Sequence, residues 1–480
     1  MNYDIVVIGG GLGGLTAGAK LTREGKRVLL IEQHSQPGGC ATTFRRHDFT
    51  FEVGLHEMDG PSSRDMKNRI FTDLEVFDNV QFIRVPEFFH FVNDRINITI
   101  PHDPSAAGAI LKERFPEDAT GIDEYFRHIL NPKKKAAGEE TPEDISVGEF
   151  LDSIINNEDL KLILLGNLGY FHDDPFSLSL AYYSIAQGSY FNGGASYIKG
   201  GSQKLSDHLA EYIRKHGGEV MLNHLVTGIN EENGKLTGVM YRQKGKDNSD
   251  ILKAYADEII VNAAVPLLAE MVSGELKASL VKEIRKQRTG ASLLTVYFGF
   301  KSNLRTLGHN HYSTFFFDNS IKSQTNILAN NRGDFRRRSF TFVDYGQIDS
   351  AIAPEGKSVG AICCIDYTSF WDDLSQEEYK SKKEEVAKIF IKRLEKYIPG
   401  ITDVIEYCEV GTPTTVRRYT LNPEGAVYGF AQTPGRILID TSGLPANLHF
   451  ASAWGKTGGG FSGAIYSGYL CAINILRKRK

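Results

Sequence analysis

The residues with the clearest chemical potential lie at the N-terminus, where glycines follow a short apolar run. Gly9, Gly11 and Gly14 have the spacing G-x-G-x-x-G directly after residues 3–8. Glycines in this pattern allow a tight turn, a close approach of a pyrophosphate to the backbone, and close packing of a helix on a strand. Glu32 follows at about 20 residues, the distance at which an acid accepts hydrogen bonds from a ribose. The pattern predicts a dinucleotide site, and the acid favours FAD or NAD over NADP.

A strand, a helix and a second strand are needed to position these residues. Residues 3–8 are apolar and β-branched, which is typical of a strand buried on both faces, and residues 27–31 form a second such run. Residues 15–25 between them predict a helix, whose N-terminus would direct free N–H groups and a positive dipole end at the phosphates. The alternative, a glycine-rich turn in an ordinary α/β unit, leaves the acid at Glu32 unexplained.

Composition limits the class of protein. The chain has 480 residues, of which 41% are hydrophobic and 24% charged, and its net charge of −4 gives no reason to expect a nucleic-acid partner. Five scattered cysteines without C-x-x-C spacing predict a reducing compartment and no metal site. We find no signal peptide and no apolar run near the ~20 residues that span a bilayer. We therefore expect a cytoplasmic protein, with membrane-surface contact left open; the basic run 477–480 could contact anionic lipid, although a solvated tail is favoured.

Two further motifs carry a family resemblance. Gly38-Gly39-Cys40 follows the ribose acid, and an acid-x-Gly-x-His stretch runs from Glu52 to His56. Together they resemble the flavoprotein family of phytoene desaturases, carotenoid cis–trans isomerases and retinol saturases, and a family-like Thr-Pro-x-Thr segment occurs within 411–429. Amine-oxidase relatives usually have Arg where this chain has Cys40. The resemblance covers residues 3 to about 476 and implies FAD, without a separate NAD-binding domain.

The resemblance also implies a fold. We expect an α/β protein with a glutathione-reductase-like, FAD-binding Rossmann domain and an inserted substrate domain of mixed β-sheet plus helices. The FAD-binding domain would be discontinuous, with residues 1–60, 193–275 and 405–480, and the substrate or cap domain would comprise 61–192 and 276–404. Apart from the resemblance, the residues of segment 411–429 predict a strand and a turn that bring polar groups beside the flavin, and the arginines at 336–338 predict a solvated strand end rather than a site for an anion.

Candidate site residues come from the glycine loop and from the family pattern. In the family, the strand after the second glycine turn lies near the adenine, a central strand ends in small residues beside the cofactor, and a C-terminal glycine turn precedes a helix aimed at the flavin. The predicted FAD contacts are Gly9, Gly11, Leu12, Gly13, Gly14, Glu32, Gln33, Gly38, Gly39, Cys40, Val226, Ala264, Trp454, Gly459, Gly460 and Phe461. Glu52 and His56 are candidates for proton handling or flavin contact, although a structural role for His56 is favoured.

These residues predict an FAD-dependent oxidoreductase that acts on C–C or C=C bonds of a polyene or isoprenoid lipid, by hydride exchange with flavin N5. Desaturation, saturation and cis–trans isomerisation share this scaffold, and the sequence does not separate them. It also names no external electron donor or acceptor. Two alternatives remain: a non-catalytic escort protein of the same fold that binds prenyl or lipid groups, and an amine-oxidase-like flavoenzyme. The intact glycine signature with Glu32 disfavours the first, and Cys40 disfavours the second.

Overall fold

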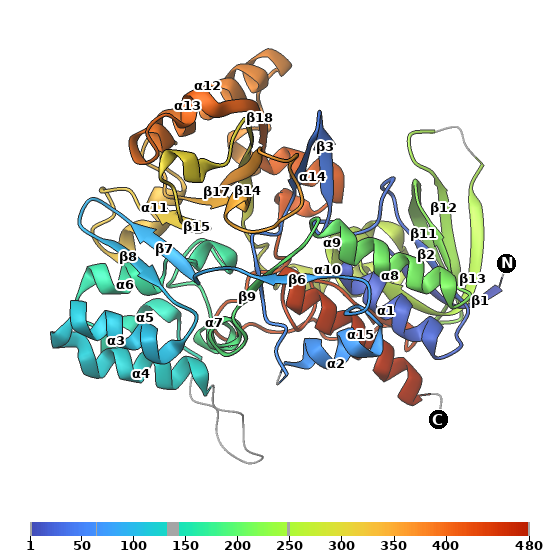
Figure 1. The fold of residues 1–480 in the computed structure, drawn as a ribbon. Coiled ribbons are helices and arrows are strands. Elements are labelled where there is room, and N and C mark those ends of the chain that lie inside the picture. Colours follow the sequence, from blue (N-terminus) through green and yellow to red (C-terminus); the bar gives the residue numbers. More distant parts are fainter. Residues whose placement is uncertain (1, 64, 132–143, 247–249, 479–480) are drawn as a thin grey trace.

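The computed structural model describes residues 2–63, 65–131, 144–246 and 250–478, and it contains two seven-stranded sheets (Figure 1). The first sheet has the order β10-β2-β1-β13-β12-β11, with β19 paired to β13. Its strands are β1 (Asn2–Ile8), β2 (Val28–Ile31), β10 (Glu219–Met221), β11 (His224–Glu232), β12 (Lys235–Gln243), β13 (Leu252–Val261) and β19 (Leu448–Phe450). Because β1 pairs in parallel with both β2 and β13, their carboxyl ends meet at one edge, where ligands bind in open α/β sheets.

Three helices from distant parts of the chain pack around this sheet. They are α1 (Leu12–Arg23), α8 (Gln203–Lys215) and α15 (Gly460–Lys478). In Figure 1 the red α15 lies beside the blue α1, and a Cβ added to Gly468 would lie 2.1 Å from the carbonyl oxygen of Gly13. The backbones of the first and last helices are therefore as close as glycine permits.

The second sheet has the order β18-β14-β17-β16-β15-β7-β8 and is mixed, because β15 pairs in parallel with β7 while its other neighbours are antiparallel. Its strands are β7 (Phe89–Val92), β8 (Asn97–Ile100), β14 (Ser292–Phe300), β15 (Ser313–Phe316), β16 (Phe340–Asp344), β17 (Ser358–Asp366) and β18 (Ile405–Gly411). β18 lies within the range 405–480 that was predicted for the FAD-binding domain, yet it pairs with β14 of the second sheet.

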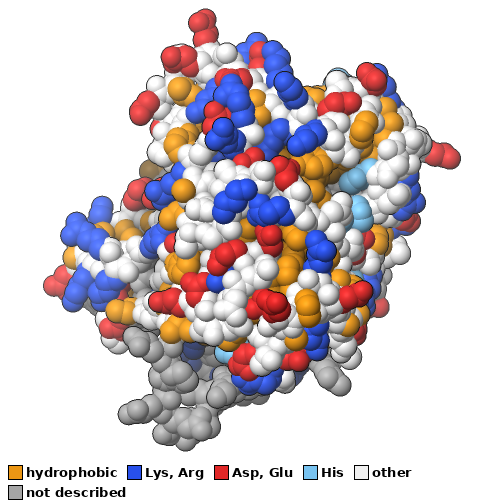
Figure 2. Space-filling view, turned by 90° about the vertical axis from the view of Figure 1, so that its left-hand side faces the viewer, with side chains coloured by type: hydrophobic (Ala, Val, Ile, Leu, Met, Phe, Trp, Pro, Cys, Tyr) orange, Lys and Arg blue, Asp and Glu red, His pale blue; other side chains and the backbone are white. Residues whose placement is uncertain are grey.

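Helices surround the second sheet on both sides (Figure 1). One group comprises α3 (Pro104–Arg114), α4 (Ala119–Leu130), α5 (Val147–Ile154), α6 (Glu158–Leu164) and α7 (Leu180–Gly193); α12 (Gln376–Tyr397) and α13 (Ile401–Val404) form another. A three-stranded sheet, β5-β9-β6, lies between the two halves; its strands are β5 (Met58–Asp59), β6 (Phe82–Arg84) and β9 (Ala195–Ile198). On the face shown in Figure 2, basic and acidic side chains are interspersed.

Two local predictions were wrong. Residues 413–420 form a helix, α14 (Pro413–Thr420), because Thr412 accepts a hydrogen bond from Thr415 N–H and Pro413 occupies the first turn. The arginine run does not end in solvent: Arg338 is 2% exposed, and its Nη1 lies 2.7 Å from Oδ1 of Asp366. Arg336 does remain exposed.

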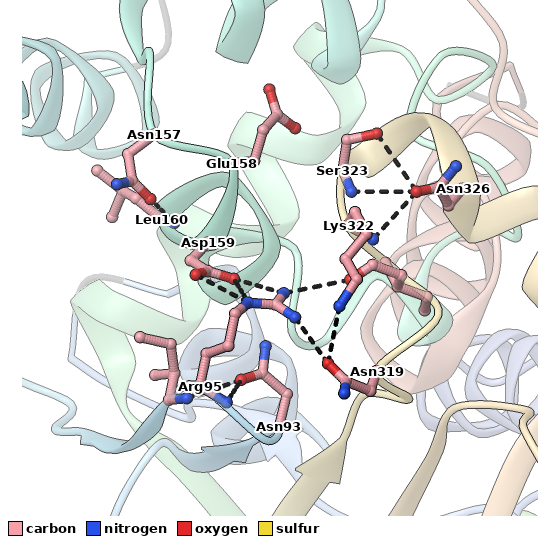
Figure 3. A network of polar contacts seen from close by, with 12 residues as sticks. Asn93, Arg95, Asn157, Glu158, Asp159, Leu160, Asn319, Lys322, Ser323 and Asn326 are labelled. Atoms are coloured by element: carbon pink, nitrogen blue, oxygen red, sulfur yellow. Dashed lines mark hydrogen bonds and ion pairs between the residues drawn. The ribbon is translucent and has the colours of Figure 1, made fainter.

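A polar network joins the helical group to the sheet (Figure 3). The Arg95 guanidinium donates to both carboxylate oxygens of Asp159 on α6, with its shortest bond at 2.6 Å, and to Oδ1 of Asn319 at 2.9 Å. It also donates to the carbonyl oxygen of Ile321 at 3.2 Å. Arg95 comes from the β7–β8 turn, so one side chain holds three segments together.

Candidate active site

The glycine loop between β1 and α1 is packed so closely that side chains are excluded. Gly9 has φ +97°, and a Cβ on Gly14 would lie 2.3 Å from the carbonyl oxygen of Gly9. A Cβ on Gly13 would lie 2.1 Å from the carbonyl oxygen of Ala451, just after β19. Gly11 is the N-cap of α1 and provides no side-chain cap, which leaves the first turn suited to an anion. Leu12, the first residue of α1, is buried in the core.

Glu32 lies directly after β2 and points back at this loop. Its Oε2 accepts a hydrogen bond from Gly10 N–H at 2.6 Å, and its Oε1 accepts one from His34 N–H at 2.7 Å. Glu32 is 7% exposed, and burial raises the pKa of its carboxyl. The next residue, Gln33, accepts a hydrogen bond from Lys244.

Val226 belongs to the strand that begins beside Glu32. His224 N–H, at the start of β11, donates to the Glu32 carbonyl oxygen at 3.0 Å. Val226 follows two residues later and is buried, 5% exposed. The predicted adenine-side residues are therefore brought together at one sheet edge.

The second glycine pair folds onto the first loop. Gly38 N–H donates to the Gly10 carbonyl oxygen at 2.7 Å, and a Cβ on Gly39 would lie 3.4 Å from the Gly11 Cα. Cys40 follows, and burial raises the pKa of its thiol to about 11. The thiol is therefore protonated at neutral pH, and it carries no charge comparable to the arginine of amine-oxidase relatives.

Asn262 was missed by the sequence reasoning, although it directly follows β13. Its Oδ1 accepts a hydrogen bond from Gly14 N–H at 2.9 Å, and its Nδ2 donates to the Gly9 carbonyl oxygen at 3.2 Å. Its amide therefore bridges both ends of the glycine loop. The predicted residues Ala264 and Trp454 lie together in a different, small apolar cluster with Phe430.

A cavity of about 790 Å³ opens between the two halves. The predicted residues Gly459, Gly460 and Phe461, at the start of α15, contribute to its wall, as do Val53 and Gly54. Its apolar wall includes Leu165, Leu168, Phe171, Leu293, Phe315 and Ile327, and its tyrosines include Tyr170, Tyr182, Tyr190 and Tyr428. Ile321, whose carbonyl is held by Arg95, also lines it.

One helix connects this cavity with the glycine loop. α15 begins at Gly460 in the cavity wall, and Gly468 of the same helix packs on Gly13. Eight residues of α-helix rise about 12 Å. An extended dinucleotide can therefore have its phosphates at α1 and its far end at the cavity.

The two candidates for proton handling have different positions. Glu52 does not line the cavity: its Oε1 accepts from the Ser202 hydroxyl at 2.5 Å and its Oε2 from Ser202 N–H at 2.7 Å. Ser202 is the N-cap of α8, so the Glu52 carboxyl stabilises this helix terminus. His56 does line the cavity, with its ring 5.7 Å from that of Tyr170. Burial lowers the pKa of His56 to about 4, so the ring is neutral at neutral pH.

Glu57, which the sequence reasoning missed, lies in the cavity wall. It is 6% exposed, and its Oε1 accepts a hydrogen bond from Tyr170 OH at 2.9 Å. Burial, together with the nearby charge of Glu87, raises the pKa of Glu57 to about 8. The carboxyl is therefore mostly protonated at neutral pH and can donate a hydrogen bond.

A buried ionic cluster lies beside Glu57. Lys67 Nζ lies 2.6 Å from Asp59 and 2.5 Å from Asp65, and it donates to Tyr466 OH at 2.9 Å. The Ser462 hydroxyl, in the first turn of α15, donates to Asp59 at 2.5 Å. This cluster anchors the start of α15. Among the described residues, no group of three or more His, Cys, Asp or Glu side chains is arranged to hold a metal ion.

The comparisons with known proteins agree with this geometry. The family model described as flavin containing amine oxidoreductase matches residues 12–476. Prolycopene isomerase 2, chloroplastic, of an Oncidium hybrid cultivar is 27% identical, over 98% of this chain and 84% of that protein. All-trans-retinol 13,14-reductase of Danio rerio is 25% identical, over 99% of this chain and 86% of that protein. A solved oxidoreductase from Methanosarcina mazei superposes with a TM-score of 0.68 at 18% identity, over 99% of this chain and 100% of its own.

The expected fold and cofactor are thereby confirmed: the glycine loop, Glu32 and the α15 terminus fit FAD, and the matching family model covers nearly the whole chain. The chain therefore belongs to the family of flavin-containing amine oxidoreductases, and it is an FAD-dependent oxidoreductase.

Proposed function

We propose that this enzyme acts on C–C or C=C bonds of a polyene or isoprenoid lipid, by desaturation, saturation or cis–trans isomerisation. The observation that carries the proposal is the cavity of about 790 Å³, whose wall combines aliphatic and aromatic side chains with polar groups and which reaches the start of α15. Cavities of roughly 300–1,000 Å³ with apolar walls and a few polar groups are typical of small-molecule sites. The isomerase and reductase relatives act, by their names, on prolycopene and on all-trans-retinol.

The residues proposed to hold FAD form two groups. The adenine and phosphate half is assigned to the glycine loop, Glu32, Val226 and the Gly38–Cys40 turn, and the flavin end to Gly459–Phe461. When bound, the flavin supplies two-electron hydride chemistry at N5. Ala264 and Trp454, which pack together with Phe430 in an apolar cluster, remain proposed FAD contacts.

Water exclusion, ligand orientation and hydrogen bonding are assigned to side chains of the protein itself. The apolar wall excludes water and orients a long ligand, while the tyrosines and Glu57 provide hydrogen bonds within it. Neutral His56 is assigned to packing against Tyr170, and Glu52 to holding α8, so neither is proposed to transfer a proton.

Contact of the protein with a membrane surface and the need for an external electron donor or acceptor are also proposed. No described helix has the length and hydropathy to cross a membrane. The basic residues at the end of α15, Arg477 and Lys478, are proposed to contact anionic lipid, while 479–480 lie outside the described residues. Net desaturation or saturation also requires an external electron acceptor or donor.

The experiment that tests the function is anaerobic incubation of the oxidised and the dithionite-reduced holoprotein with a panel of polyenes. Mass spectrometry separates a loss of two hydrogens, a gain of two hydrogens and an unchanged mass with altered double-bond geometry. Conversion of amines but of no polyene would overturn the proposal in favour of an amine oxidase. A protein that cannot be loaded with FAD would favour the lipid escort.

A further inference from the structure

Glu57 differs from every other acid in the cavity wall. Its Oε1 is fixed by Tyr170 OH, but its Oε2 is buried without a hydrogen-bond partner among the described residues. Within that part of the chain, no Lys, Arg or His forms an ion pair with it. Tyr190 OH contacts the Glu57 backbone carbonyl at 3.4 Å, which further fixes the position of this residue. The Glu57 side chain is therefore held in place, while its Oε2 has no hydrogen-bond partner among the described residues.

Asp59, two residues further along in the same cavity wall, is an acid whose carboxylate has partners within the protein. Its carboxylate is bound by Lys67 at 2.6 Å, by Ser462 at 2.5 Å and by Ser189. Asp59 is thus satisfied within the protein, whereas Glu57 is not. A buried polar atom that is left unpaired costs free energy, and sites built to hydrogen-bond a hydroxyl use such a group to reject analogues that lack it.

We propose that the ligand of this cavity is an oxygenated polyene or isoprenoid, and that Glu57, positioned by Tyr170, forms a hydrogen bond with its hydroxyl group. The proposal rests on the proposed function and narrows its substrate class from any polyene to one that carries an alcohol. A pure hydrocarbon fills the apolar wall equally well but leaves the Glu57 oxygen without a partner. The alcohol satisfies it, because a carboxyl group can both donate to and accept from a hydroxyl.

The test compares two probes that differ in one group: all-trans-retinol and the hydrocarbon of the same skeleton, with hydrogen in place of the hydroxyl. Binding to FAD-loaded protein is followed by perturbation of the flavin absorbance spectrum and by equilibrium dialysis. We expect the wild-type protein to bind the alcohol on the order of 10- to 100-fold more tightly than the hydrocarbon. Equal affinities would overturn the proposal.

Three variants assign the preference to a residue. Glu57→Leu should abolish it, by weakening binding of the alcohol and strengthening binding of the hydrocarbon, whereas Glu57→Gln should keep most of it because the amide still donates. His172→Phe is the matched control: His172 also lines the cavity and its Nε2 also lacks a partner among the described residues. A preference that survives Glu57→Leu, or that is lost in His172→Phe instead, would overturn the role of Glu57.

Failure of this inference is distinguishable from failure of the proposed function. If the polyene panel is converted but the alcohol preference is absent or independent of Glu57, only the inference falls. If the FAD-loaded protein neither binds nor converts any polyene, both fall. Folding of each variant is checked by its FAD content and melting temperature, and Glu57→Gln keeps the experiment decisive if the leucine variant is unstable.

Discussion

Removal of the Glu32 carboxylate tests the cofactor assignment most directly. In the structure this group accepts hydrogen bonds from Gly10 N–H at 2.6 Å and His34 N–H at 2.7 Å. It lies at the carboxyl edge of the first sheet, where a ribose is expected to donate its hydroxyl protons. The change Glu32→Ala therefore removes the proposed ribose interaction and two hydrogen bonds within the loop.

The expected magnitude follows from the charge on the acceptor. A hydrogen bond to a charged group contributes about 1.5–3 kcal/mol, so removing each hydrogen bond from the ribose weakens FAD binding by about 10- to 150-fold. The hydrogen bonds within the loop add to this effect only if the apoprotein loop changes shape. Their contribution is visible separately, as a lower melting temperature of the Glu32→Ala apoprotein.

The assay is titration of apoprotein with FAD, followed by quenching of flavin fluorescence. Glu231→Gln, an exposed acid on β11 of the same sheet, is the matched control and should bind FAD like wild type. An unchanged dissociation constant for Glu32→Ala would refute the ribose assignment. A decrease in affinity that only mirrors a decrease in apoprotein stability would reduce Glu32 to a structural part of the loop.

Three further changes probe the rest of the molecule. Arg338→Ala leaves Asp366 buried and unpaired, so it should lower the free energy of unfolding, measured by urea denaturation, by about 3–5 kcal/mol. The control Arg336→Ala removes an exposed side chain and should change this free energy by less than about 0.5 kcal/mol. Similar effects of the two substitutions would contradict a buried Arg338–Asp366 ion pair. Gly468→Val should separate α1 from α15 and cost about 1–3 kcal/mol or more, while Gly443→Ala, which meets nothing within 4 Å, should be nearly neutral in the same melts. Burial raises the pKa of Glu57 from 4.5 to about 8, so between these values the folded protein keeps a proton that the unfolded chain has released, and this group makes stability fall as pH rises through that window. Glu57→Gln should remove this part of the fall, so its melting temperature relative to wild type should increase from pH 6 to pH 9; a constant difference would argue against a protonated Glu57.

The nucleotide-binding half could be predicted from sequence because its signals are local. The strand, the glycine loop, the helix and the acid at Glu32 follow each other within the first 32 residues, and each has a physical reason that depends on near neighbours. The start of α14 could also have been predicted, since threonine at the N-cap and proline in the first turn are common at helix N-termini, as with Thr412 and Pro413 here. The segment was instead interpreted as a strand and a turn.

The different positions of the acids Glu52 and Glu57 could not be predicted in the same way. Glu52 ends the strand β4 (Phe49–Glu52), Glu57 lies five positions further along, and nothing local shows which of them faces the cavity. That choice depends on Ser202, which engages Glu52, and on the pairing of β5 with β9, well over a hundred residues further along the chain. Arg338 was misread for the same reason, because its partner Asp366 lies on another strand.

The close packing of Gly13 and Gly468 has a consequence for biosynthesis. The segments that meet there are separated by 455 positions, which a ribosome adding about 5–20 residues per second needs roughly 20 to 90 s to traverse. Throughout that interval the nascent N-terminal helix lacks its packing partner, and its apolar flank is available to chaperones. We therefore expect loading with the flavin nucleotide to follow translation, so a C-terminally truncated chain that lacks α15 should be colourless even though every residue of the glycine motif is present.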